Sequence, residues 1–159
     1  MLKGLMAITI FIFSGSLLFG GEAWCVKKFN IKSEPSTISQ WLKEHSAEVA
    51  KATGNEIVSK DGDNIRLMQD TPKGIIEFTV HEKFTDDKTT YSYNSDLTKV
   101  HQGPIEDQKT IVKINVVDGR TVVEIKLFAK VEDTASVSIK TKLHKSTKGF
   151  QELLERKFN

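Results

Sequence analysis

The sequence near the C-terminus reads Phe150-Gln151-Glu152-Leu153-Leu154-Glu155-Arg156-Lys157-Phe158. At helical spacing this stretch separates into an apolar face and a polar face. The apolar face carries Phe150, Leu153, Leu154 and Phe158, and the polar face carries Gln151, Glu152, Glu155 and Arg156. Full burial of each large apolar side chain contributes roughly 1.5–3 kcal/mol, so a stripe of this size is not left in water. We therefore predict a C-terminal helix, beginning after Thr147 and Gly149, that docks on a sheet.

The sequence before this helix alternates apolar and polar residues with the period of a β-strand. In the clearest case, Val123, Ile125, Leu127, Ala129 and Val131 share one face, with Glu124, Lys126 and Lys130 on the other. The same alternation predicts strands at 57–58, 65–68, 76–80, 90–93 and 112–116, with Tyr91 and Tyr93 on one face. A last strand is predicted at 137–143, with Val137, Ile139, Thr141 and Leu143 pointing inward.

Turn signals separate these strands. Asp118-Gly119 is the strongest hairpin signal in the chain, because both residue types tolerate positive φ. Asp61-Gly62-Asp63-Asn64 and Asp86-Asp87 have turn composition as well, and 101–107, around Gly103-Pro104, is predicted to be a loop. Strands joined by hairpins form an antiparallel sheet with one solvated face, so the helices must cover the other face.

The region that precedes the hairpins combines one strand with a helical segment. Residues 26–32 fit a strand, and from Ser36 the period becomes helical, with Ile38, Trp41, Leu42, Val49 and Ala52 on one face. Pro35 precedes the helix, Ser36 and Thr37 are candidate caps, and Gly54 closes it, with a break near 44–46. The predicted fold class is therefore α+β: a curved antiparallel sheet of about seven strands, an early helical segment and a long C-terminal helix.

The first 23 residues have the parts of an export signal. Lys3 gives a basic start, 5–13 is an apolar run that Leu17-Leu18-Phe19 extends, and small residues stand near the end. The alternative is a membrane anchor, but Ser14-Gly15-Ser16 breaks the run below the ~20 residues that a spanning helix needs. We predict cleavage after Ala23, a secreted or periplasmic location, no stable membrane anchor after cleavage and one domain at 24–159.

Cysteine content and charge narrow the possibilities further. Cys25 is the only cysteine, which excludes an intramolecular disulfide, and Trp24 before it argues against a lipidated cysteine. The net charge of +2 predicts no nucleic-acid partner. The sequence specifies no oligomeric state.

The order of elements resembles the START-like superfamily, also called SRPBCC, Bet v 1-like or helix-grip proteins. The resemblance rests on the early helix at 36–53 after a first strand, and on the ending at 135–143 that leads through Lys148-Gly149 into 150–156. It covers most of 24–159 and implies a cavity between sheet and terminal helix for an apolar small molecule, such as a lipid, sterol or polyketide. The candidate lining residues are Phe78, Tyr91, Tyr93, Ile125, Leu127, Phe150, Leu153 and Leu154.

Two alternatives stay open. One is an enzyme of the polyketide cyclase or dehydrase type on the same fold, in which Tyr91, Tyr93 or His81 projects into the cavity and polarises a carbonyl. The other is a structural or interaction module with a filled core, because an alternating strand looks the same whether it faces a void or packed atoms.

Motifs for metal, cofactor or nucleophilic chemistry are not found. His45, His81, His101 and His144 lack the spacing of zinc ligands, and no glutamate completes a calcium loop from Asp61. His81 and Glu82 are neighbours on a strand and so point to opposite faces. The acidic pairs at 86–87 and 106–107 read as exposed turns, and no GxSxG or Gly-rich phosphate loop occurs. We predict no catalytic residue, no metal and no cofactor.

Overall fold

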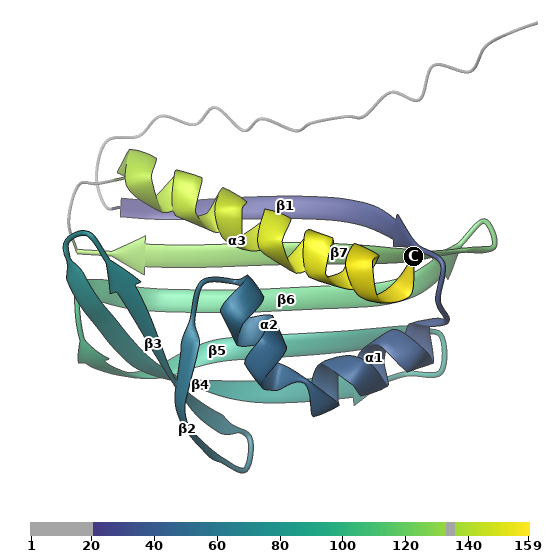
Figure 1. The fold of residues 1–159 in the computed structure, drawn as a ribbon, viewed down its shortest axis with the longest axis horizontal. Helices are drawn as coiled ribbons and strands as arrows, with labels where there is room; N and C mark the ends of the chain where they lie inside the picture. The colour runs from purple at the N-terminus through teal and green to yellow at the C-terminus, as the bar shows by residue number, and fades with distance from the viewer. Residues whose placement is uncertain (1–20, 133–135) are drawn as a thin grey trace, which may run out of the picture.

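The structure, a computed structural model, describes residues 21–132 and 136–159. Its elements follow the order β1, α1, α2, β2 to β7 and α3 (Figure 1). The strands are β1 (Gly21–Ile31), β2 (Glu56–Asp61), β3 (Asn64–Thr71), β4 (Gly74–Asp86), β5 (Thr90–Gln102), β6 (Ile105–Val117) and β7 (Arg120–Val131). The helices are α1 (Pro35–Glu44), α2 (Ser46–Ala52) and α3 (Ser136–Phe158).

All seven strands form one antiparallel sheet in the order β1-β7-β6-β5-β4-β3-β2. The three helices lie on the same face of this sheet (Figure 1). Helix α3 crosses β1 and β7, whereas α1 lies against β5 and β6 and α2 against β2 and α3. The predicted α+β class and the curved antiparallel sheet are therefore confirmed.

The tight turns follow the local sequence. Asp118 and Gly119 both have positive φ, at 50° and 74°, as the predicted hairpin between β6 and β7 requires. The predicted loop at 101–107 is much shorter, because β5 runs to Gln102 and β6 begins at Ile105. Gly103 has a φ of 100°, and a Cβ there would lie 3.1 Å from Ile76, so this turn needs glycine.

The strand predicted at 137–143 is wrong, because these residues form the first turns of α3. The alternation of Ile139, Thr141 and Leu143 is compatible with a strand. Ile139 and Leu143 are also four residues apart, which places them on the same face of a helix. Together with Thr147, Phe150 and Leu154 they make one helical stripe, in which Ile139, Thr147, Phe150 and Leu154 are buried. Helix α3 thus begins at Ser136, about four turns before the position that the sequence predicted.

The early helical segment is divided as predicted. His45 separates α1 from α2 with φ −120° and ψ 38°, and its ring stacks on Trp41 with centroids 4.6 Å apart. The cap assignment was wrong: Glu34 is the N-cap residue and makes no side-chain cap hydrogen bond, so neither Ser36 nor Thr37 caps α1. Pro35 begins the helix because its fixed φ suits the first helical position.

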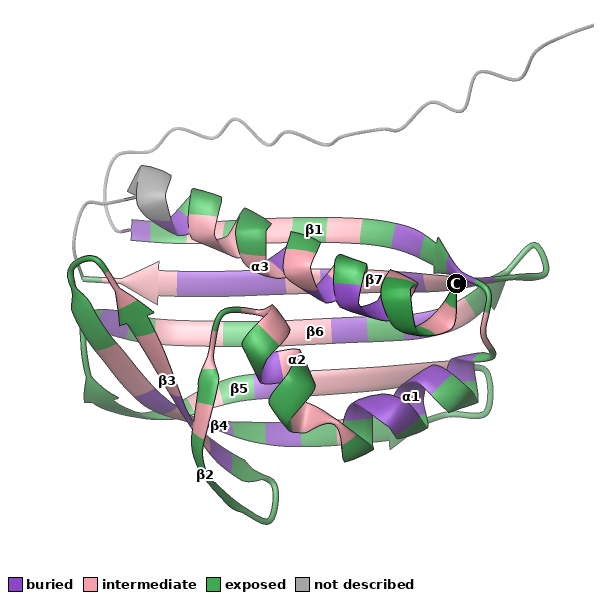
Figure 2. Cartoon of the chain, viewed as in Figure 1, coloured by how far each residue is buried: buried purple, intermediate pink, exposed green. Residues whose placement is uncertain are grey.

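The buried apolar side chains form two clusters. Figure 2 shows the buried positions on α1, on α3 and on the strands behind them. The first, which we call the packed cluster, joins α1 and α3 to β1, β7 and β6 and includes Ile38, Trp41, Val112, Val123, Ile125, Leu127, Phe150, Leu153 and Leu154. The second, which we call the cavity cluster, consists of Ala50, Ile65, Leu67, Phe78, Val80 and Ile105. The two clusters differ in packing, because the whole of the cavity cluster borders a large void.

The opposite face of the sheet is polar, as predicted. Lys28 and Lys126 flank Glu124 there, with N to O distances of 2.8 and 3.1 Å. Burial alone raises the pKa of Glu124, but the hydrogen bonds and charges of the two lysines outweigh burial and hold this pKa below its usual value. Trp24 and Phe128 form an apolar pair on this face: the half-exposed Trp24 covers Phe128, with ring centroids 4.6 Å apart.

Candidate functional site

A cavity of about 720 Å³ opens between the sheet and the helices. Its walls come from α2, from residues between 139 and 150 of α3 and from parts of β2 to β7. Most of the wall is apolar and includes every member of the cavity cluster, and Leu143 and Ile139 add apolar surface from α3. Protein interiors rarely leave voids larger than a water molecule, so this space is far larger than a packing defect.

Five of the predicted lining residues lie on this wall: Phe78, Tyr93, Ile125, Leu127 and Phe150. The other three do not. Leu153 and Leu154 are buried in the packed cluster, and Tyr91 packs against that cluster beside a small surface cleft near Glu34. The cavity is offset along α3, beneath its first turns, because the large side chains of its last turns fill the space between α3 and the sheet.

Several lining residues were missed from the sequence. Ile65 and Leu67 alternate on β3, and their strand was predicted, but nothing local indicates that β3 curls over the cavity. Glu82 also lines it, and here a signal was present. Phe78, Val80 and Glu82 follow one another at the period of a strand, so they share the inward face.

Glu82 is held within a polar network on the cavity wall. Its side chain is buried, and the Tyr93 hydroxyl donates a hydrogen bond of 2.8 Å to Glu82 Oε1. Lys60 Nζ lies 3.6 Å from the other carboxylate oxygen, and Ser95 pairs with Glu82 across the β4–β5 ladder. Burial and the negative charge of Glu82 raise the pKa of Tyr93 far above its usual range. The phenol therefore stays protonated, and it donates its hydrogen bond to Glu82.

The Tyr93–Glu82 bond yields a test by double-mutant cycle. We expect Tyr93→Phe to lower the free energy of unfolding by about 2 kcal/mol, because it leaves a buried carboxylate oxygen without a donor. Glu82→Met is expected to cost a similar amount. The double variant is expected to cost clearly less than the two losses added together, with a coupling of about 1–3 kcal/mol. Urea denaturation of the four proteins measures this coupling, and strictly additive losses would contradict the bond.

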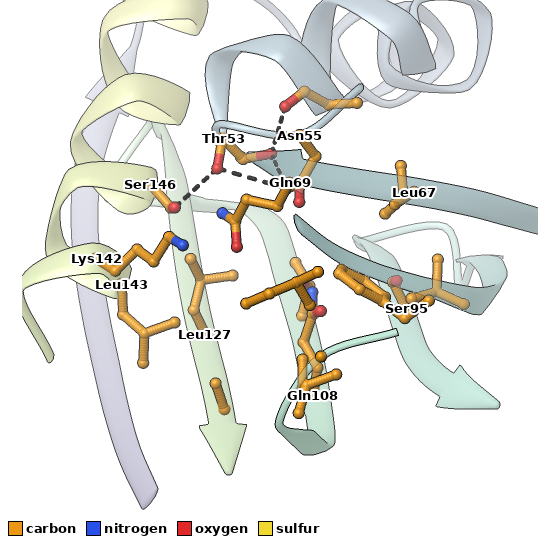
Figure 3. A pocket seen from close by; sticks show the side chains of 18 of the residues that line it. Thr53, Asn55, Leu67, Gln69, Ser95, Gln108, Leu127, Lys142, Leu143 and Ser146 are labelled. Atoms are coloured by element: carbon orange, nitrogen blue, oxygen red, sulfur yellow. Dashed lines mark hydrogen bonds between the residues drawn. The ribbon is translucent and has the colours of Figure 1, made fainter. Parts of the chain in front are cut away.

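A second polar group lies where α2 approaches α3 (Figure 3). Ser146 Oγ donates to the Thr53 carbonyl at 2.8 Å, and Asn55 Nδ2 donates to the same carbonyl at 3.4 Å and to Thr53 Oγ1 at 3.2 Å. Gln69 extends from β3 toward this corner, and Lys142 extends into the cavity from α3. Polar side chains therefore gather at one end of a wall that is otherwise largely apolar.

Other chemistry is sparse in the part of the chain that the structure describes. No three His, Cys, Asp or Glu side chains gather there in a way that suits a metal ion. His81 is exposed and contacts Asn64 Oδ1 at 3.3 Å, and His101 contacts Thr79 Oγ1 at 2.8 Å. Within 21–132 and 136–159, no helix has the length and apolar character needed to cross a membrane.

Comparison with known proteins identifies the fold. No protein-family model matches the chain, and no curated protein matches it significantly in sequence. Solved structures do match it. A START superfamily protein from Mycobacterium smegmatis aligns with a TM-score of 0.65 and 12% identity, covering 85% of this chain and 96% of that one. Ara h 8.0201 aligns with a TM-score of 0.52 and 15% identity, covering 84% and 98%.

A third structure, the major latex-like protein 151 of Panax ginseng, aligns with a TM-score of 0.52 and 11% identity, covering 85% of this chain and 99% of that one. In all three cases nearly the whole of the matched chain is covered. The protein therefore has the START-like, helix-grip fold, and the resemblance inferred from the order of elements is confirmed.

Proposed function

We propose that this domain binds an apolar small molecule, of the lipid or polyketide class, in the cavity between its sheet and α3. The observation that carries the proposal is the cavity itself. Its volume of about 720 Å³ falls within the range of about 300–1,000 Å³ that is typical of small-molecule sites. A largely apolar wall with few polar groups is the composition that such sites share.

The two alternatives explain less of the structure. A module with a filled core accounts for the packed cluster, but it gives no reason for a large void beside Leu67, Phe78 and Ile105. An enzyme that polarises a carbonyl through the residues considered above lacks a placed donor. Tyr91 lies outside the cavity, His81 is on the exposed face, and the Tyr93 proton is already donated to Glu82. Binding without chemistry is the simpler function.

We further propose that the domain acts outside the cytoplasm, after removal of 1–23 as an export signal. Residues 1–20 lie outside the described part of the chain, so this proposal rests on sequence alone. Cleavage after Ala23 would remove the first three residues of β1 and keep the pairing of Trp24 with Phe128. The intact mass of the natural protein reports where the mature chain begins.

The binding proposal is tested on the chain purified under native conditions from its natural host. We expect organic extraction and mass spectrometry to yield one apolar compound in stoichiometric amount. Ala129→Phe places a large side chain in the cavity and is expected to abolish this yield, whereas Val26→Phe, on the outer face of β1, is expected to retain it. An empty extract, together with no thermal stabilisation by a panel of lipids, would overturn the proposal in favour of the filled-core module.

A further inference from the structure

The charged side chains on the cavity wall are unbalanced. Among the described residues that line it, four are lysines, namely Lys73, Lys109, Lys142 and Lys145, and one is an acid, Glu82. Glu82 is not available to offset them, because it accepts the Tyr93 hydrogen bond and faces Lys60. The cavity therefore offers positive charge to whatever enters it.

Lys142 differs from the other three lysines in its position. Lys73, Lys109 and Lys145 are exposed, whereas Lys142 is half-buried and extends from α3 into the cavity (Figure 3). No described carboxylate lies within ion-pair distance of Lys142, although Lys28, Lys60, Lys126, Lys130 and Lys148 each have such a partner. Burial lowers the pKa of Lys142, which shows a desolvated cation without a compensating acid.

A second donor faces the same corner. Gln69 on β3 is half-buried, lines the cavity and points toward Lys142 in Figure 3. Its amide has no hydrogen-bond partner among the described residues, so two N–H donors are free there. By contrast, the neighbouring hydroxyl of Ser146 already donates a hydrogen bond to the Thr53 carbonyl. A free ammonium and a free amide that converge from two elements suit an oxyanion.

We propose that Lys142, assisted by Gln69, binds the anionic head group of an amphiphilic ligand, a carboxylate or a phosphate, whose chain lies along the cavity cluster. This inference rests on the proposed function, because it names the class of molecule that the cavity takes. An anion restores the pairing that Lys142 lacks, and hydrogen bonds between ionised partners are stronger than those between neutral groups. The apolar side chains of Ile65, Phe78 and Val80 provide the surface for the chain.

The test compares three probes of equal chain length: hexadecanoic acid, hexadecyl phosphate and hexadecanol. Binding to the full-length protein is measured by calorimetry or by displacement of a fluorescent lipid. We expect Lys142→Met to weaken binding of the acid, of the phosphate or of both by about tenfold or more. The affinity for hexadecanol is expected to stay unchanged. Lys142→Arg keeps the positive charge and is expected to retain most of the affinity. Lys140→Met removes an exposed lysine of α3 outside the cavity lining and is expected to change nothing.

Each outcome has a separate meaning. If only the carboxylate or only the phosphate loses affinity in Lys142→Met, that group is the natural head group. If acid, phosphate and alcohol bind the natural chain equally and Lys142→Met affects none of them, the anion site is disproved while the binding cavity stands. If none of the three probes binds and the native extract is empty, the proposed function itself fails. A thermal melt of Lys142→Met confirms that the variant is folded, and Lys142→Arg answers the question if it is not.

Discussion

Replacing Gly149 by alanine is expected to lower the free energy of unfolding by about 3 kcal/mol. The sign is opposite to the usual one, because alanine in place of glycine inside a helix normally stabilises by about 1 kcal/mol. Here an added Cβ would overlap the carbonyl oxygen of Ala52, at the end of α2. That oxygen belongs to the backbone and cannot rotate away, so α2 and α3 would have to separate.

Separation of the two helices would also change the cavity. The hydrogen bond from Ser146 to Thr53 joins the same helices and lies at the cavity wall. Lys148→Ala is the matched control, because Lys148 is the exposed neighbour whose ion pair with Glu152 contributes little. Urea denaturation measures both variants. A stabilised Gly149→Ala protein would show that α2 and α3 approach less closely than described here.

Leu154→Ala is expected to cost about 4 kcal/mol, and Leu67→Ala about half of that. Both side chains are buried, at 0% and 9% exposure, but their surroundings differ. Leu154 lies in the packed cluster, where its removal leaves a new void with lost contacts on every side. Leu67 already borders the cavity, so fewer neighbours lose a contact.

This contrast is measured by urea denaturation of protein refolded without ligand. The two substitutions remove the same atoms, so each variant serves as the control for the other. Equal losses would show that the wall around Leu67 is as tightly packed as the interior around Leu154, and the cavity would then be closed in solution. A ligand bound to the natural chain is expected to raise its stability and to raise that of Leu67→Ala less.

The fold was largely predictable from the sequence. The one large error of the prediction, the strand at 137–143, has a local cause. Strands such as 123–131 show unambiguous alternation, and Asp118-Gly119 specifies its hairpin. At 137–143, Ile139 and Leu143 satisfy both the strand and the helix period, and two lysines and one threonine fill the positions between them. These residues form a helix because Ile139 and Leu143 continue the buried stripe of Phe150 and Leu154. That stripe becomes visible only when the helical period is followed along the whole of α3.

The cavity was less predictable than the fold. The alternation predicts that Phe78 and Leu127 point inward. It does not predict how far away the facing element lies, and so it does not distinguish a cavity from a packed core. That depends on the lengths and angles of α2 and of the curled β2–β3 hairpin, which are tertiary properties. Lys142 stands between Thr141 and Leu143, which were predicted to point inward from a strand, and alternation would turn Lys142 outward. Its position in the cavity follows only from the helix that these residues form. Glu82 was within reach, since the inward period of β4 runs through it.

The position of β1 at one edge of the sheet governs how the domain assembles. The β2 to β7 hairpins join neighbours in sequence and form by local contacts, whereas β1 pairs with β7 from the opposite end of the domain. Closing that long loop carries a large entropic cost before any contact repays it. Helix α3 packs on β1 and β7 together, so its docking completes the same step. Folding is therefore expected to be slow and highly cooperative, with the pairing of β1 and β7 as the step that limits its rate.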